Sequence, residues 1–216
     1  KHLCLGLLMS ISVSLNSYAK ENAYRLSPFI QPSFQQIMLK VDPDSPDFSG
    51  QTTISIDITK ATNTVGFYQK QLNIQQAYLT AGDTKIDLTV TAHEYDIQHA
   101  KAANMIPANR YQLTIIFDGQ FNTSSDGMYL SKFEGLNYVF TQFEDMYARQ
   151  AFPSFDEPAF KIPYQLTITS PEKHTVLSNT LVNKRTVKDG WQTVEFNKTK
   201  PMPTYLVALA VGELDS

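Results

Sequence analysis

Residues 54–59 read Ile54-Ser55-Ile56-Asp57-Ile58-Thr59, an unbroken alternation of apolar and polar side chains. Successive side chains of a β-strand point to opposite faces, so this alternation predicts a strand with one buried face and one solvated face. The same pattern recurs at residues 86–90 and 111–117. Weaker versions of it predict further strands, at residues 37–41, 164–168 and 191–196.

Turn-forming residues separate the predicted strands. Asp, Gly, Pro and Ser, which favour tight turns, gather at residues 42–47, 81–83, 118–119, 125–127 and 188–190. Residues 205–211 form a continuous apolar run, which favours a central strand covered on both faces. Only residues 97–106 could hold a short helix. Strands joined by short turns predict an all-β domain, an antiparallel sandwich or barrel.

The composition is that of a folded protein with no nucleic-acid surface. The chain has 216 residues, of which 42% are hydrophobic and 18% charged, so it can bury a core large enough to fold without a covalent staple. Its formal net charge is −3 and its Lys and Arg residues are scattered. A partner with a phosphate backbone is therefore excluded on electrostatic grounds.

The one cysteine, Cys4, lies inside an apolar run at residues 3–15 that follows a basic start and leads to Ala19. This order predicts a secretory signal peptide over residues 1–19. A buried helix is the alternative, since the run is too short to span a bilayer. Cleavage would leave a cysteine-free domain at residues 20–216, which excludes disulfides and thiol catalysis. It would also favour export to a bacterial periplasm or the medium. No later stretch of sequence is apolar enough to form a transmembrane segment.

The histidines do not form a recognisable metal motif. Residues 93–99 begin like the H-E-x-x-H zinc motif, but the position of the second histidine is taken by Ile97. On a strand, His93 and His99 would lie ~20 Å apart, so we expect them to be solvated, and we expect His174 to lie in an exposed turn. We therefore predict no metal site and no Ser/His/Asp triad, although triads are recognised by spatial geometry rather than by sequence order.

Residues 138–161 combine four carboxylates, one arginine and several aromatic rings with weak periodicity. Two prolines in this segment restrict the backbone and bracket a turn. Arg149 can make a bidentate ion pair with Asp156 or Glu157. We interpret these three residues as a structural loop held by that pair, in preference to a direct catalytic role.

Gln142 and Glu144 have a different character. They are two residues apart, so at the end of a strand their side chains would point the same way. An amide beside a carboxylate is suited to holding an ammonium group, because the carboxylate supplies charge and the amide supplies a donor and an acceptor. A solvated strand face is the alternative interpretation.

The same segment carries a family resemblance. The strings T-Q-F-E at residues 141–144 and A-F-P-S-F-D-E-P-A-F-K at residues 151–161 resemble the signature of the N-terminal domain of zinc aminopeptidases of the aminopeptidase N type. One departure is Ser154, where many relatives have cysteine. Shorter matches to that family lie at residues 127–129, 148–149, 178–179 and 201–213.

The resemblance implies an all-β, antiparallel, saddle-shaped β-sandwich, followed by a thermolysin-like catalytic domain that binds zinc through H-E-x-x-H and carries a G-A-M-E-N segment. Neither motif occurs in this sequence. Residues 20–216 are therefore expected to be the N-terminal β domain of a metalloaminopeptidase, with the catalytic domain absent from this chain. The zinc of the intact parent would be bound by that missing domain, and the chain alone is expected to be inactive.

The resemblance also implies substrate-binding roles. Gln142 would line the pocket for the first side chain of the substrate, and Glu144 would bind its free α-amine. The implied partners are peptide N-termini and the downstream catalytic domain. Two alternatives remain open: a secreted, non-catalytic β-sandwich binding module that uses exposed aromatics such as Tyr129 and Tyr147, and an inactive aminopeptidase paralogue.

Overall fold

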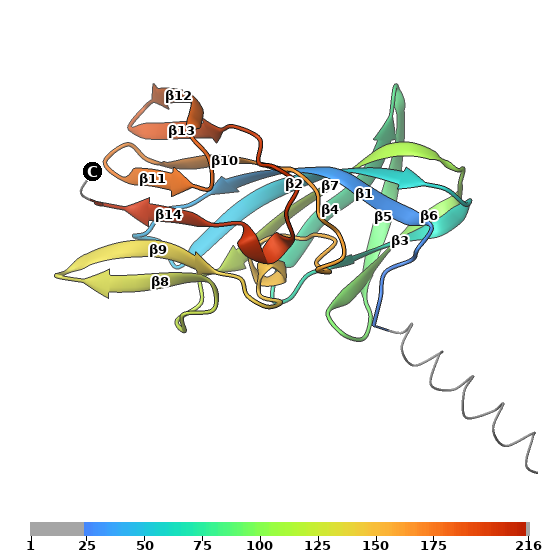
Figure 1. Ribbon diagram of the computed structural model, residues 1–216, viewed down its shortest axis with the longest axis horizontal. Coiled ribbons are helices and arrows are strands. Elements are labelled where there is room, and N and C mark those ends of the chain that lie inside the picture. The colour runs from blue at the N-terminus through green and yellow to red at the C-terminus, as the bar shows by residue number, and fades with distance from the viewer. Residues whose placement is uncertain (1–23, 215–216) are drawn as a thin grey trace, which may run out of the picture.

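A computed structural model describes residues 24–214, whose regular secondary structure consists of β-strands in two sheets and two short 3₁₀ turns (Figure 1). The predicted signal peptide, residues 1–19, lies outside the described residues. In sheet order, the ten-stranded sheet contains β12 (Val182–Lys188), β13 (Trp191–Phe196), β10 (Tyr164–Pro171), β1 (Ile30–Lys40), β2 (Asp47–Ile58), β7 (Asn109–Gln120), β4 (Asn73–Ala81), β5 (Thr84–Ala92), β6 (Ile97–Ile106) and β3 (Thr62–Tyr68). The four-stranded sheet contains β11 (Thr175–Ser178), β14 (Leu209–Gly212), β9 (Leu136–Gln142) and β8 (Gly127–Phe133).

The two sheets pack face to face and confirm the predicted all-β sandwich. Neighbouring strands are antiparallel with one exception among the described strands, the parallel pair of β1 and β10. β10 returns to the large sheet only after the chain has passed through β8 and β9 of the small sheet. A parallel pair needs such a long crossover, which a short turn cannot provide.

The alternation of apolar and polar residues is reproduced in the burial of the strands. Ile54, Ile56 and Ile58 of β2 are buried, with exposed fractions of 1% or less, while the residues between them are partly exposed. β7 buries Leu113 and Ile115 on the same face, although Thr114 between them is also only 5% exposed. These strands form because one face of each can be removed from water.

Two sequence-based expectations about elements were wrong. Residues 97–106 form β6 and not a short helix, because this segment pairs on one side with β5 and on the other with β3. The apolar run at residues 205–211 is not one strand, since a 3₁₀ turn, η2 (Thr204–Leu206), takes up its first part. Only β14 continues as a strand, between β11 and β9.

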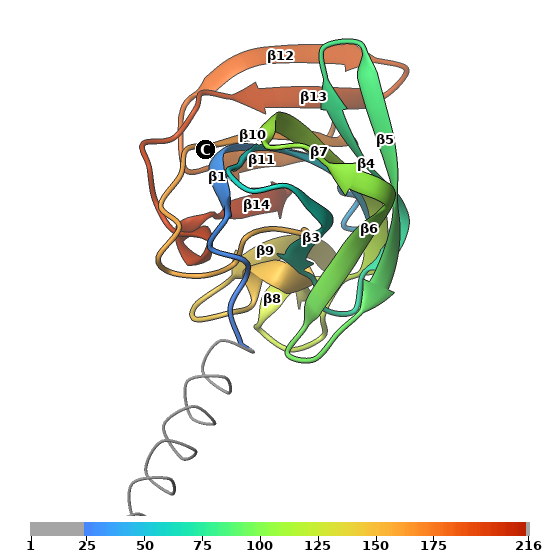
Figure 2. The same ribbon diagram turned by 90° about the vertical axis from the view of Figure 1, so that its right-hand side faces the viewer.

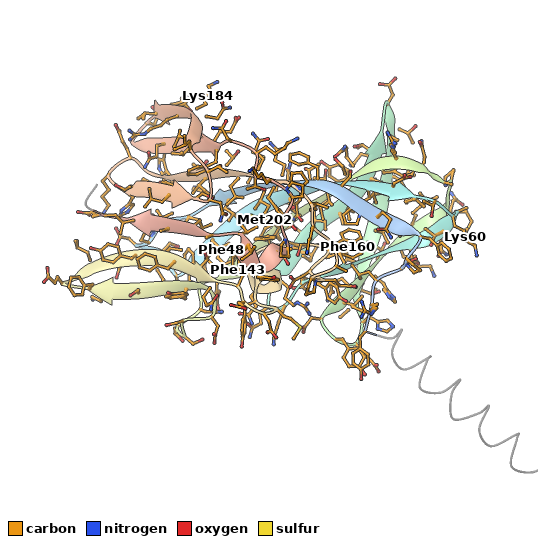
Figure 3. All side chains as sticks on the ribbon, in the orientation of Figure 1. Phe48, Lys60, Phe143, Phe160, Lys184 and Met202 are labelled. Carbon is orange, nitrogen blue, oxygen red and sulfur yellow. The ribbon has the colours of Figure 1, made fainter. Side chains whose placement is uncertain are left out.

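The protein has two hydrophobic cores. The first lies between the two sheets and includes Phe48, Phe143 and Phe152; Figure 3 shows Phe48 and Phe143 near the middle of the molecule. The second consists mainly of residues from the large sheet, together with Phe155. Residues of one sheet can pack against one another only if the sheet curls, and Figure 2 shows this curl at the end that carries β5, β6 and β3.

The loop that follows β9 joins the two cores. Phe152 belongs to the first core and Phe155, three residues later, to the second. Phe160, labelled in Figure 3, packs edge to face on Phe155 with ring centroids 5.8 Å apart. Among residues 24–214, no helix is long and apolar enough to cross a membrane.

Candidate functional site

Gln142 and Glu144 flank a buried anchor at the end of β9. Gln142 is the last residue of the strand and pairs with Gly127 of β8. Phe143 is 1% exposed and meets Phe152 edge to face, with ring centroids 5.7 Å apart. Aromatic pairs of this geometry stabilise beyond the area they bury. Phe143 therefore fixes the position at which the exposed side chains of Gln142 and Glu144 leave the core.

Glu144 lies beyond the strand, which modifies the expectation that both side chains leave one strand face. The chain turns at residues 144–147, and the backbone N–H of Tyr147 donates to the carbonyl oxygen of Phe143 at 3.0 Å. The backbone N–H of Glu144 donates to Oε1 of Gln142 at 3.1 Å. The Glu144–Asp145 peptide bond is cis.

The hydrogen bond between the two residues determines which of their atoms are available. The Oε1 atom of Gln142 is occupied, so its amide group offers N–H donors to a ligand. The Glu144 carboxylate is exposed and takes part in no hydrogen bond or ion pair within residues 24–214. The pair therefore presents a donor and an unpaired negative charge side by side.

β8, the strand that pairs with the end of β9, requires a glycine at the position opposite Gln142. Gly127 has φ +67°, a conformation that L-residues rarely adopt. A Cβ atom there would lie 2.8 Å from Nδ2 of Asn122 and 2.8 Å from Oε1 of Gln150. The Asn122 amide also donates to the carbonyl oxygen of Asp126 at 2.7 Å. This close packing supports the base of the loop that carries Glu144.

Arg149 forms a buried ion pair with Asp156 beneath the exposed residues. Its Nε atom donates to Oδ2 of Asp156 at 2.8 Å, and its Nη2 atom donates to the backbone oxygen of Asp156 at 3.0 Å. Asp96 lies 3.6 Å from Nη1, and the ring centre of Tyr68 lies 4.2 Å from the guanidinium carbon. Arg149 and Asp156 are only 6% and 3% exposed. The hydroxyl of Thr204 donates to the other oxygen of Asp156.

Glu157 binds residues 25 and 26, near the start of the described chain, and does not pair with Arg149. Its Oε1 atom accepts from the backbone N–H of Leu26 at 2.7 Å and from the Tyr68 hydroxyl at 3.1 Å, and Arg25 lies 3.7 Å from Oε2. Burial, and then the nearby Glu157 carboxylate, raise the pKa of Tyr68, so its hydroxyl stays protonated and can donate.

The charged atoms of Arg149, Asp156 and Glu157 are engaged in contacts inside the protein. Of the two predicted pairings, the structure contains the one with Asp156. It engages one carboxylate oxygen and one backbone oxygen, in place of the expected bidentate carboxylate pair. Sequence reasoning missed Tyr68, Asp96 and Thr204, because no spacing connects residues 48 or more positions away with this loop.

A depression of about 490 Å³ opens beside this network. Tyr24, Tyr95 and Met146 contribute to its wall, and the rings of Tyr24 and Tyr95 are 3.9 Å apart. The paired groups of Arg149 and Glu157 also line it. Because those charges already have partners, the free surface of the depression is mainly aromatic and apolar.

The structure corrects two expectations about histidines. The rings of His93 and His99 lie 4.2 Å apart and not ~20 Å apart. The chain reverses between these residues, and β6, which carries His99, runs back beside β5. Partial burial, and then His93, lower the pKa of His99. His174 is only 4% exposed, so the expectation of an exposed turn was wrong. Burial is the main cause that lowers the pKa of His174.

Tyr129 and Tyr147 are half-buried and not the exposed aromatics of a binding face. Tyr147 packs against the first core, and the ring of Tyr129 lies 6.2 Å from that of Phe140. The structure therefore gives no support to a binding module built on these two rings.

The side chains around Gln142 and Glu144 do not fit a catalytic zinc ion. Catalytic zinc takes three protein ligands, most often histidines with or without a carboxylate. This segment offers the amide of Gln142, the carboxylates of Glu144 and Asp145 and no histidine, and the sequence lacks H-E-x-x-H. What the arrangement can do is hold a cationic group against Glu144 while the amide of Gln142 donates a hydrogen bond.

Comparison with known proteins gives a consistent result. A family profile described as the Peptidase M1 N-terminal domain matches residues 31–206. The chain is 32% identical to aminopeptidase N of Rattus norvegicus over 215 residues, covering 89% of the chain and 22% of that protein. It is 32% identical to the puromycin-sensitive aminopeptidase of Caenorhabditis elegans over 201 residues, covering 88% of the chain and 21% of that protein.

A bacterial protein is similar to the same degree. Aminopeptidase N of Acetobacter pasteurianus is 32% identical over 203 residues, covering 90% of the chain and 56% of that protein. The chain thus spans about a fifth of the length of the plant and animal relatives it matches and just over half of this bacterial one.

Proposed function

Because the chain belongs to the family of Peptidase M1 N-terminal domains, we propose that it is the substrate-positioning domain of an exported zinc-dependent aminopeptidase. The complete enzyme would remove N-terminal amino acids from peptides. The observation that carries this proposal is the unpaired Glu144 carboxylate beside Gln142, within a chain whose relatives are aminopeptidases.

The chemistry of an exopeptidase explains why these two residue types are suited to the role. An aminopeptidase must recognise a free α-ammonium group, and a carboxylate binds it by a charge-assisted hydrogen bond. Glu144 offers such a carboxylate, and its attraction strengthens once a bound peptide excludes water. The Gln142 amide lies beside Glu144, whose backbone N–H donates to it. It would contact the first residue of the substrate.

The loop behind Glu144 provides the rigidity that positioning requires. Phe143 and Phe152 anchor it in the first core, and the Arg149–Asp156 pair locks its other end. A displacement of about 1 Å at a positioning group can cost on the order of 100-fold in rate. The buried network thus contributes to catalysis by holding Glu144 still.

The zinc ion would be held by the downstream catalytic domain of the parent protein. When bound, it would polarise the scissile carbonyl and activate water. The residues of this chain would fix the amine end of the peptide, so that the first peptide bond is the one presented to the metal.

The test is the substitution Glu144→Ala in the intact aminopeptidase. Loss of the ammonium partner should lower kcat/KM for free-amine aminoacyl substrates by about 30-fold or more, which corresponds to about 2 kcal/mol. Glu144→Gln should also be impaired, since the amide keeps the shape but not the charge.

Glu94→Ala serves as the matched control, because Glu94 is an exposed glutamate in the turn between β5 and β6. It should leave kcat/KM unchanged. Wild-type kinetics in Glu144→Ala would refute the amine-binding role. An inactive paralogue, the alternative left by the sequence, would show no turnover in the wild-type protein.

A further inference from the structure

The parallel pairing of β1 and β10 brings two loops together at one edge of the large sheet. Parallel strands end on the same side, and here the backbone N–H of Val41, just after β1, donates to the carbonyl oxygen of Thr169 in β10 at 2.9 Å. The β1–β2 loop and the β10–β11 loop therefore leave the sheet side by side, at the left in Figure 1. The first loop carries Asp42 and Asp44, and the second carries His174.

These three residues form a cluster of potential metal ligands. One carboxylate oxygen from Asp42, one from Asp44 and one ring nitrogen of His174 all lie within 4.8 Å of one another. Ligand atoms that share a tetrahedral zinc ion at 2.0–2.1 Å lie about 3.4 Å apart. A modest contraction of two turns would bring the three atoms to that spacing.

His174 supplies independent evidence that a ligand belongs here. Its side chain is 96% removed from solvent, yet neither Nδ1 nor Nε2 has a hydrogen-bond partner within residues 24–214. A buried polar group without a partner costs about 1–3 kcal/mol. A neutral imidazole carries one ring nitrogen with a free lone pair, and a ring nitrogen of His174 lies within 4.8 Å of carboxylate oxygens of Asp42 and Asp44.

The surroundings orient the carboxylates. Asp44 accepts hydrogen bonds from Lys173 at 2.9 Å and from Asn137 at 3.0 Å, and Asp42 accepts one from the backbone N–H of Asp44 at 3.0 Å. Hydrogen bonds of this kind fix ligating carboxylates in metal sites. Asp42, Asp44 and the nearby Glu213 bring three negative charges against the single positive charge of Lys173.

We propose that Asp42, Asp44 and His174 bind a divalent transition-metal cation of the Zn²⁺ or Mn²⁺ class. The imidazole nitrogen favours Zn²⁺ over Ca²⁺ and Mg²⁺, which take oxygen ligands, and the two carboxylates also suit Mn²⁺. The ion gives the buried imidazole its missing partner and neutralises the excess negative charge.

The position of the site indicates a structural role. The loop that carries His174 runs from β10 of the large sheet to β11 of the small sheet, and Asn137 belongs to β9 of the small sheet. A bound ion would therefore clamp the junction of the two sheets. Asn137 and Gln142 are five residues apart on β9, or about 17 Å, so the ion would not contact a ligand at Glu144.

The test is direct metal binding to the 216-residue chain. Equilibrium dialysis against Zn²⁺ and Mn²⁺, followed by metal analysis, should give one ion per wild-type chain. Trp191 is the only tryptophan and lines the same cavity of about 820 Å³ as Asp42, so its fluorescence should change on titration. His174→Phe and Asp44→Asn should each weaken binding at least tenfold.

Two features make the variants informative. His174→Phe keeps a buried ring, and Asp44 is exposed, so both variants should retain the far-ultraviolet circular dichroism of the wild type. His93→Gln controls for chelation by the His93–His99 pair, and Asp83→Asn controls for the loss of a surface charge. Failure of the wild type to bind either ion at millimolar concentration would overturn the proposal, as would binding that survives in both His174→Phe and Asp44→Asn or is lost in His93→Gln.

Discussion

Ser154 shows how a single side chain can be poorly matched to its site. It is fully buried between the two cores, where its backbone pairs with Tyr68 through hydrogen bonds of 2.8 and 3.1 Å. Its hydroxyl has no partner within the described residues. The backbone therefore accounts for the contribution of Ser154 to the fold, and the hydroxyl only carries a desolvation cost.

Ser154→Ala should consequently stabilise the protein by about 1 kcal/mol, because it removes a buried polar group that forms no bond. The measurement is the free energy of unfolding from urea titration. Ser170→Ala is the matched control, since Ser170 is equally buried but its hydroxyl contacts Gln192 at 3.3 Å. The control should be destabilised, and a loss of stability in Ser154→Ala would contradict this account.

At the same scale, the sequence was informative about residue type and less so about conformation. The spacing of Gln142 and Glu144 indicated a polar pair at a strand end, and both are exposed there. The turn that takes Glu144 out of the strand was not predictable, because it depends on Phe143 entering a core assembled from distant residues. The burial of His174 was missed for the same reason.

At the scale of elements, the loop after β9 connects segments that are far apart in the chain. Arg149 and Asp156 tie it to β3 through Tyr68 and to the 3₁₀ turn η2 through Thr204. Breaking a buried ion pair leaves an uncompensated charge, which is far more costly than losing a surface pair.

Asp156→Asn should lower the free energy of unfolding by about 3 kcal/mol, because Arg149 would stay buried without its main counterion. The comparison is Asp87→Asn, which removes the exposed Lys85–Asp87 pair of 2.9 Å and should cost less than about 1 kcal/mol. Equal losses in the two variants, measured by urea titration, would show that burial does not strengthen the loop pair.

About half of the strands of residues 24–214 were predictable, because their alternation is local, as in β2. β6 was not recognised, since its buried positions include Ala100 and Ala102, and alanine favours helices in isolation. Pairing with β5 and β3 overrides that preference, and no pattern within residues 97–106 contains this information.

At the scale of the whole molecule, sheet order was beyond the reach of local patterns. Alternation shows which face of a strand is buried but not which strand lies beside it. The placement of β10 next to β1 depends on packing in the first core, which contains residues of both strands. The family resemblance favoured the sandwich over the barrel and supplied the roles expected for Gln142 and Glu144, which alternation alone could not provide.

The chain by itself should not hydrolyse aminoacyl reporters, because the residues around Glu144 offer no ligand set for a catalytic zinc ion. Purified protein would be assayed with and without added Zn²⁺, next to the intact aminopeptidase as positive control. Hydrolysis by the chain alone that a chelator abolishes would place the catalytic metal in this domain and refute the division of labour.

The parallel pair of β1 and β10 also limits the order in which the large sheet can fold. Gln35 of β1 pairs with Tyr164 of β10, so one edge of β1 stays open until the ribosome has made the chain well past its middle. Contacts that distant in sequence form slowly. A newly synthesised chain would therefore remain incompletely folded for longer, which is the state in which a polypeptide can be threaded through a translocation channel.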